Sequence, residues 1–517
     1  MHIPMKPRGF APGSTEFASR KFAPRSARSA GLWLASTAAV AVAVSGGAAM
    51  ADGKGSNGHQ REWYVSASAT AGGDGSRKAP FNSLAKVQQA SSPGDTITVL
   101  ASPVSVAPLD GGIVLKPGQR LVGDGPPVLH PGPALVKGGP AVMAPSSASS
   151  LPRIANTSNV TNSGDAVTLA DDTQVENLVI AGAFRGAIHG QDVIDVNLRG
   201  NDISGFNTSG TRGFVVQPFF LESYTAGIAN DVANGLPAGW AAILIDTTNV
   251  STSLSINDNY VHDGVCGDGI DIRGQNTGYV SAQINSNFVT RLKQCSNVST
   301  IEGIGTQVTG SSRMRASLFG NTEADNGNPG ANMDSLFVNP AETGTLVETI
   351  DHNVYLNGIG GASTNGMEFI LSNGSANATV TITNSFFMGN PGDMLEEFNR
   401  GGAGSTATLI LDHVTVEQTT FTGGLPTYAN PPGSAASPDN TGECLGIGSV
   451  GTNDTTILQM IDSSFTGCDN NGIEVTNNHP NGSGDGVGPP IRWSWTSTTA
   501  RSAAAASTIC GSTTSRR

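Results

Sequence analysis

The sequence predicts an all-β fold, a single-stranded parallel β-helix, which is a solenoid whose coils each add strands to long parallel sheets. Three observations predict it: an internal repeat of about one coil, a composition rich in small and polar residues, and an N-terminal pattern of strand, short helix and strand. A single coil cannot bury its own apolar face, so this fold requires many stacked copies of the repeat.

The repeat is an apolar residue, two variable residues, and then Asn or another polar residue. Most copies lie 28 to 34 residues apart, and two longer intervals leave room for an insertion or a second coil. Apolar residues of successive coils would stack into a core, while Asn tolerates the left-handed conformation of a corner and can satisfy nearby backbone groups. The polar positions are Asn201, Asn259, Asn287, Asn321, Asn353, Ser385, His413 and Ser464.

The composition favours many short strands joined by turns. The 517 residues include 67 Gly, and only 13% are charged. Hydrophobic residues make up 38% and occur in regular short runs, which argues against a disordered chain. The sequence therefore indicates an ordered, turn-rich β protein.

Residues 52–125 are predicted to form an N-terminal cap and the first coil. Leu84 and Val87 can face one side of a short helix, which Pro93-Gly94 would end. Thr96 to Leu100 then alternates as a strand. A cap is expected because an open end of the solenoid would expose strand edges to other chains.

The same segment carries a series of short motifs in a defined order. They are Trp63-Tyr64-Val65-Ser66, Gly72-Gly73-Asp74-Gly75, Ala79-Pro80-Phe81 and Gly118-Gln119-Arg120-Leu121-Val122-Gly123-Asp124-Gly125. This stretch of about sixty residues resembles the entry into the pectin-lyase-like β-helix proteins. The resemblance implies a right-handed winding and an N-terminal cap, and it makes carbohydrate-directed chemistry the leading expectation.

Residues 1–51 are predicted to be a cleaved signal peptide. Six Lys or Arg residues precede an Ala/Val-rich run over residues 30–44, and Ala49-Met50-Ala51 fits a cleavage site. The apolar run is shorter than the roughly 20 residues that span a bilayer. The protein is therefore expected to be secreted or periplasmic, with no membrane span after cleavage.

The rest of the chain is assigned to one solenoid and a tail. Residues 126–491 should form the β-helix, with insertions near 207–240 and 418–443, and residues 492–517 form a low-complexity C-terminal tail. Without residues 1–51 the net charge is −18, which makes nucleic acid an unsuitable partner because phosphate binding needs concentrated Lys and Arg. The expected partner is an extracellular polysaccharide.

The cysteine spacing suggests disulfides between neighbouring coils. Cys266 and Cys295 are 29 residues apart, and Cys444 and Cys468 are 24 apart, so each separation approximates one coil. Four cysteines still allow three connectivities. Cys510 is left over.

The densest polar stretch, residues 262–273, contains the first candidate site residues. Asp268 and Asp271 could act as acids or ligate a metal such as Ca²⁺, while Arg273 could anchor the substrate or act as a base. The alternative is a corner turn in which Cys266 forms a disulfide.

A column of acids about sixteen residues before the corner positions gives two more candidates, Glu368 and Glu397. Like Asp271, each is expected to point outward from a strand, because it alternates with apolar neighbours. Successive coils lie ~4.8 Å apart, so Glu368 and Glu397 are expected to be neighbours on one face. Paired carboxyl groups suit glycoside hydrolysis, and an acid cluster holding Ca²⁺ suits a polysaccharide lyase. The alternative is that they are ordinary solvated residues.

Two functions from different classes remain open. The first is a polysaccharide lyase or glycoside hydrolase whose groove is walled by the 207–240 insertion. The second is a non-enzymatic, adhesin-like binding protein with acids spread around the solenoid. The polygalacturonase strings Asn-Thr-Asp, Asp-Asp, Gly-His-Gly and Arg-Ile-Lys do not occur as an ordered set, so that mechanism is not carried over.

Overall fold

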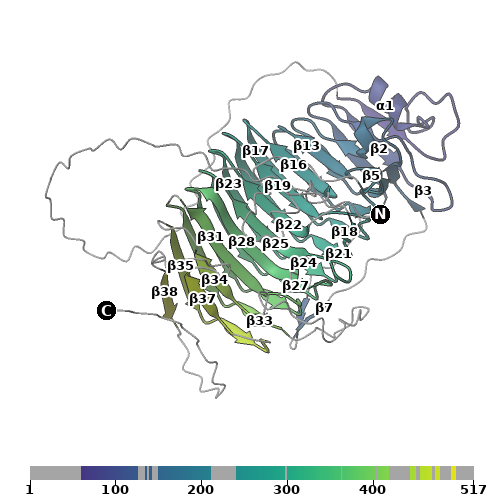
Figure 1. The fold of residues 1–517 in the computed structure, drawn as a ribbon. Helices are drawn as coiled ribbons and strands as arrows, with labels where there is room; N and C mark the ends of the chain where they lie inside the picture. Colours follow the sequence, from purple (N-terminus) through teal and green to yellow (C-terminus); the bar gives the residue numbers. More distant parts are fainter. Residues whose placement is uncertain are drawn as a thin grey trace, which may run out of the picture. The chain divides into compact units, whose positions relative to one another are not determined.

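The fold is the right-handed parallel β-helix that the sequence predicts, as seen in a computed structural model. The solenoid has three long parallel sheets of 13, 11 and 10 strands. We call them the first, second and third sheet. Within each sheet, strands of successive coils lie side by side along the solenoid (Figure 1). The structure describes residues 60–125, 134–136, 139–141, 150–210, 240–296, 300–361, 364–402, 404–418, 443–449, 454–468, 472–477 and 491–496.

Each regular coil visits the second, the first and then the third sheet. The first sheet contains β1 (Glu62–Val65), β2 (Thr96–Leu100), β5 (Arg120–Asp124), β11 (Gln174–Glu176), β14 (Val196–Arg199), β17 (Ser251–Asn257), β20 (Tyr279–Asn285), β23 (Arg313–Phe319), β26 (Thr345–Asp351), β29 (Asn377–Thr383), β32 (Thr406–Asp412), β35 (Thr455–Ile461) and β38 (Ile491–Thr496). The second contains β4 (Ile113–Val114), β10 (Val167–Thr168), β13 (Ile188–Gln191), β16 (Ile243–Thr247), β19 (Ile270–Gly274), β22 (Ile301–Val308), β25 (Met333–Pro340), β28 (Thr364–Gly374), β31 (Leu395–Gly402), β34 (Gly446–Ser449) and β37 (Glu474–Asn477). The third contains β9 (Arg153–Asn156), β12 (Val179–Ala183), β15 (Asp202–Ser204), β18 (Tyr260–His262), β21 (Phe288–Thr290), β24 (Thr322–Ala324), β27 (Val354–Leu356), β30 (Phe386–Met388), β33 (Thr415–Glu417) and β36 (Ser464–Thr466).

The N-terminal cap forms as the sequence predicts. Helix α1 (Leu84–Ala90) buries Leu84 and Val87, and its contacts are with β1 and β4 at the first coil. Two short antiparallel pairs and one 3-10 turn complete the described elements: β3 (Ser102–Pro103) with β8 (Ser150–Leu151), β6 (Ala134–Val136) with β7 (Gly139–Ala141), and η1 (Asn162–Gly164).

Register between coils stacks aliphatic side chains into a continuous core. One inward column of the first sheet runs through successive coils without a break: Leu198, Ile256, Ile284, Leu318, Ile350, Ile382, Leu411 and Met460. These side chains are at most 6% exposed. The column corrects the predicted repeat at its C-terminal end, where His413 and Ser464 are each one residue out of register. Val414 and Ser463 occupy the ladder positions instead, and the backbone N–H of Val414 donates to the Ser463 hydroxyl.

The repeated Asn residues form a buried ladder. The side-chain amide of Asn259 donates to Oδ1 of Asn287 at 3.0 Å, and that of Asn287 donates to Oδ1 of Asn321 at 3.0 Å. The Asn287 amide also donates to the backbone oxygen of Ile256, in the preceding coil. The expectation that Asn satisfies backbone groups is confirmed. The expectation that it adopts the left-handed conformation is wrong, because positive φ falls one residue earlier, as at Ser286.

Replacing Asn287 with Ala is expected to lower the free energy of unfolding by about 3 kcal/mol. The substitution leaves several buried donors and acceptors without partners, and each costs about 1–3 kcal/mol. Urea denaturation measures the loss, with Gln283→Ala as the control because Gln283 is an exposed residue of β20, the strand just before Asn287. A ladder variant as stable as the control would contradict this role.

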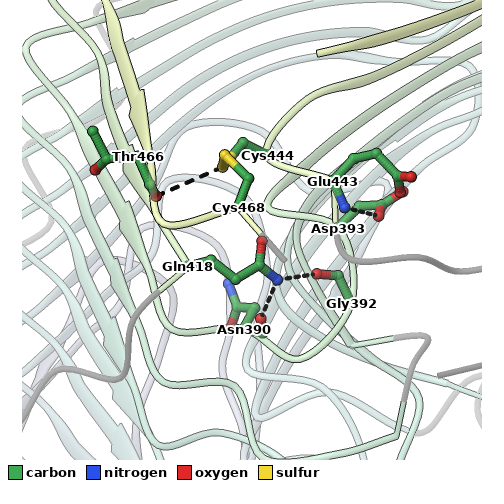
Figure 2. The surroundings of a disulfide bond; sticks show 8 residues. All are labelled: Asn390, Gly392, Asp393, Gln418, Glu443, Cys444, Thr466 and Cys468. Carbon is green, nitrogen blue, oxygen red and sulfur yellow. Dashed lines mark hydrogen bonds between the residues drawn. A yellow bond between two sulfur atoms is a disulfide. The ribbon is translucent and has the colours of Figure 1, made fainter. Parts of the chain in front are cut away.

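Two predicted disulfides are present. Cys266 joins Cys295, and Cys444 joins Cys468. Figure 2 shows the second pair, with Gln418 below it donating to the backbone oxygens of Asn390 and Gly392. The disulfides therefore link the turns before β19 and β34 to neighbouring segments.

Several sequence predictions concern residues outside the described part of the chain. These are the signal peptide at 1–51, most of the 207–240 and 418–443 insertions, and Cys510. β38 places residues 492–496 in the first sheet, although the sequence assigns them to the tail. No helix among the described residues is long and apolar enough to cross a membrane.

Candidate functional site

The outer face of the second sheet carries a concentrated group of charged side chains. In β19, Ile270 and Ile272 belong to the hydrophobic core, so Asp271 and Arg273 between and after them point to the outer side. Asp271 is 0% exposed and Arg273 is 1% exposed. The outward orientation was expected, but the alternative that these residues are solvated is wrong.

Asp271 lies at the centre of the group. Its Oδ2 contacts Nη2 of Arg273, and its Oδ1 accepts a hydrogen bond from Nε2 of Gln307 at 3.2 Å. The same Gln307 nitrogen lies 3.3 Å from Oε2 of Glu302. Gly305 makes room for this convergence, because a Cβ there would lie 2.1 Å from Oε2 of Glu302 and 3.1 Å from Oδ1 of Asp271. Two carboxyl groups and one guanidinium therefore meet around a shared amide.

Asp268 lies just before β19, where the strands of the second sheet begin, and its side chain is hydrogen-bonded to the next coil. Its Oδ1 accepts a hydrogen bond from the backbone N–H of Glu302 at 2.9 Å. The arrangement recurs along this edge: Asp165 accepts from the N–H of Gly186, and Asp393 from the N–H of Glu443, as Figure 2 shows. Asp268 thus belongs to an edge ladder as well as to the charged group.

Burial and mutual repulsion shift the acids toward their neutral forms. Burial and the charge of Asp271 raise the pKa of Asp268 well above its usual range. Burial also raises the pKa of Asp271, although Arg273 offsets part of this effect. Neighbouring acids with different partners are the arrangement from which enzymes draw one proton donor and one base.

A second, more accessible part of the group lies on β13 and just before β10, β13 and β16. Asp165 accepts two hydrogen bonds from Arg185, at 2.8 Å from Nε and 2.5 Å from Nη2, and its Oδ2 lies 3.2 Å from Nδ1 of His189. Arg185 stacks over the Trp240 ring at 4.3 Å, and His189 meets that ring edge-on at 5.3 Å. The side chains of Arg185 and His189 are 26% and 15% exposed. This is where the charged group reaches solvent.

Asp246 connects the two parts. It is paired in register with Arg273, and its Oδ2 lies 3.9 Å from Nε2 of His189. Its Oδ1 is buried without a hydrogen-bond partner among the described residues. We call the whole set the outer-face cluster: Asp165, Arg185, His189, Trp240, Asp246, Asp268, Asp271, Arg273, Glu302 and Gln307.

The structure separates the other two predicted residues. Glu368 lies on the same outward column as Asp271, three strands further along the second sheet, a distance of roughly 14 Å at ~4.8 Å per strand. Its neighbour on β31 is Glu396, not Glu397. Glu397 pairs instead with the core residue Phe369, and Thr456 of the first sheet donates to it at 3.4 Å. The expectation that Glu397 faces outward beside Glu368 is therefore wrong.

The cluster does not fit the Ca²⁺ site that Asp268 and Asp271 suggested. Calcium takes six to eight oxygen ligands. Oδ1 of Asp268 already accepts a backbone hydrogen bond, and Asp271 is occupied by Arg273 and Gln307. Among the residues that the structure describes, no three His, Cys, Asp or Glu side chains converge to hold a metal ion.

Sequence reasoning missed Asp165, Arg185, Asp246 and Glu302 and gave His189 no role. The local signal for Asp246 is its place in Ile243-Leu244-Ile245-Asp246, which aligns with Ile270-Asp271-Ile272-Arg273 one coil later. Without the strand register between coils, the sequence does not show which charged residues of adjacent coils lie beside one another.

Comparisons with known proteins give similarity to solved structures alone. No protein-family model and no curated protein matches the chain. Pectate lyase Pel9A is similar at 12% identity over 81% of this chain and 79% of that chain, with a TM-score of 0.37. A rhamnogalacturonan lyase is similar at 11% identity over 83% and 89%, with a TM-score of 0.34. A GH136 lacto-N-biosidase from Eubacterium ramulus is similar at 12% identity over 70% and 65%, with a TM-score of 0.29.

Proposed function

We propose that this protein is a secreted carbohydrate-active enzyme that cleaves an extracellular polysaccharide at the outer-face cluster. The observation that carries the proposal is the convergence of Asp246, Asp271, Arg273 and Glu302 on one face of the second sheet, continuous with the partly exposed Arg185 and His189. Shifted ionisation of several interacting groups is characteristic of catalytic sites.

The roles follow from position. Asp271 and Arg273 form a buried ion pair that, with Asp268, determines the electrostatic environment of the cluster's more exposed part, Arg185 and His189. Glu368 lies further along the same column and is 6% exposed, so it receives no role at the cluster. Glu397 receives no role at this face because it points into the core. The arrangement serves either hydrolysis or elimination, since both need a proton donor at the leaving oxygen.

Activity on a panel of polysaccharides tests the proposal. The protein without residues 1–51 is incubated with plant, algal and bacterial polymers, with Ca²⁺ and with chelator, and both reducing ends and unsaturated products are measured. We expect new reducing ends from at least one polymer. Unsaturated products identify a lyase, and their absence identifies a hydrolase. Failure to release product from any polymer would overturn the enzymatic proposal.

One observation favours a second candidate, a polysaccharide-binding protein without catalysis. Asp268, Asp271 and Glu302 are each 0% exposed, which suits acids that hold coils together. This candidate predicts binding of a polymer without product release. It also predicts that Asp271→Asn leaves polymer affinity unchanged.

A further inference from the structure

The outer-face cluster contains a histidine whose surroundings differ from those of its buried acids. Asp268, Asp271 and Glu302 are each 0% exposed, so they do not contact a polysaccharide directly in this conformation. Arg185 and His189 are the cluster's ionisable side chains with appreciable exposure, and an arginine does not lose its proton in proteins. His189 is therefore the proton-transferring side chain that a substrate can reach.

The two ring nitrogens of His189 are placed differently. Nδ1 lies 3.2 Å from Oδ2 of Asp165, a carboxylate that Arg185 and the N–H of Gly186 hold in position. Nε2 lies 3.9 Å from the nearer oxygen of Asp246, which is beyond hydrogen-bond distance. Asp165 thus orients the ring, and the proton on Nε2 is left available.

The environment also determines the charge of the imidazole. Burial disfavours the protonated form, but the carboxylates of Asp165 and Asp246 outweigh it and raise the pKa of His189. Burial likewise opposes ionisation of Asp165, but Arg185 and His189 prevail and lower its pKa. Both shifts favour the ion pair in which Asp165 is a carboxylate and the His189 ring is protonated. The charged groups facing the ring are Asp165, Arg185 and Asp246.

We propose that His189 is the catalytic acid that protonates the leaving oxygen, positioned by Asp165. This inference rests on the proposed function. As the glycosidic C–O bond breaks, its electron pair moves to the leaving oxygen, which takes the Nε2 proton. The reaction releases one proton, from the attacking water in hydrolysis or from carbon in elimination. Solvent water accepts that proton, and His189 takes a proton back from solvent through its exposed side, so the cycle closes without a further base.

His189→Gln tests the assignment against a matched control, His262→Gln. His262 also lies between two carboxylates, at 2.6 Å from Asp263 and 2.8 Å from Asp202, and its side chain is 16% exposed. It belongs to the third sheet and has no place in the cluster. We expect His189→Gln to lower kcat by about 10²–10⁴-fold with little change in KM, whereas the control keeps the wild-type rate.

The pH profile separates a catalytic role from a structural one. A catalytic acid makes activity fall as pH rises through its pKa, so this alkaline limb should disappear in His189→Gln. An unchanged rate and profile would overturn the assignment and leave the proposed function standing. A wild-type protein that releases no product from any polymer overturns both. NMR titration of the imidazole gives a reading without substrate: a pKa above about 6.5 that falls in Asp165→Asn supports the assignment, and a pKa at or below that value overturns it.

Discussion

The β-helix is expected to lose stability as pH rises from about 4.5 to about 7, because two acids lie inside its core. Glu348, on β26, stacks in register between the core residues Ala316 and Val380. Glu323, on β24, lies between Val289 and Tyr355 in the same way. Both glutamates are 0% exposed, and neither oxygen of Glu323 has a hydrogen-bond partner of normal geometry among the described residues.

The loss of stability with rising pH follows from the direction of the pKa shifts. Burial raises the pKa of Glu348 from 4.5 to about 7, even though the Thr306 hydroxyl donates to it at 2.7 Å, and burial raises the pKa of Glu323 well above its usual range. At pH values between the pKa of the unfolded state and the pKa of the folded state, the folded protein binds more protons than the unfolded protein. The stabilisation is therefore complete below about pH 4.5 and falls as pH rises. The raised pKa of His189 acts in the same sense. Acids with lowered pKa, such as Asp165, affect stability below about pH 4.

Glu348→Gln isolates this effect. Glutamine keeps the shape and the Thr306 contact but cannot ionise, so this variant should be more stable than the wild type at pH 7 by roughly 3 kcal/mol. The two proteins should have similar stability at pH 4.5. Urea unfolding at both pH values measures the difference, with the partly exposed Glu176→Gln as control. Equal pH dependence in wild type and Glu348→Gln would contradict the account of the core.

Removing the Asp271 carboxylate is expected to be the most damaging single change at the cluster. Asp271→Ala takes away the group that the buried Arg273 contacts, and loss of one member of a buried ion pair costs about 3–5 kcal/mol. The matched control is Asp124→Ala. Asp124 pairs with Arg77 at 2.7 Å, but these side chains are 39% and 61% exposed, and such pairs contribute less than about 1 kcal/mol.

A double variant shows whether the pair exists for stability. Replacing Asp271 and Arg273 together by Leu and Met removes both charges and keeps similar volume, which is often neutral for stability. We expect thermal unfolding to show that the double variant recovers most of the stability lost in Asp271→Ala, and activity assays to show no recovery. Recovery of polysaccharide cleavage in the double variant would contradict a catalytic role for the pair.

The fold could be predicted from sequence because its determinants are local and repeated. Three features produce a periodic pattern in the sequence: the aliphatic column through Ile256 and Ile284, the Asn ladder, and the buried face of α1. The repeat failed at His413 and Ser464, where Val414 replaces the ladder residue and a neighbouring polar residue satisfies the pattern. A one-residue error of this kind is invisible without the strand register.

The site was predictable only where it lies within one strand. Asp271 and Arg273 belong together on β19, and their alternation with Ile270 and Ile272 reveals their outward face. Glu397 follows Glu396, and the sequence does not show which of the two faces the core. The partners of Asp271 come from other coils, so only the stacked structure brings Asp246 and Glu302 to it.

Product release by Asp271→Asn tests the central claim most directly. The rate is compared with the wild type on the polymer that the panel identifies, after circular dichroism and urea unfolding show that the variant is folded. Glu348→Gln serves as the control because its carboxyl group is buried on the inner side of the coil. Because Asp271 holds Arg273 and the rest of the cluster in position, the account predicts a loss of about 10²-fold in Asp271→Asn and a wild-type rate in the control. A folded Asp271→Asn protein that keeps the wild-type rate would contradict the assignment of the outer-face cluster as the active site.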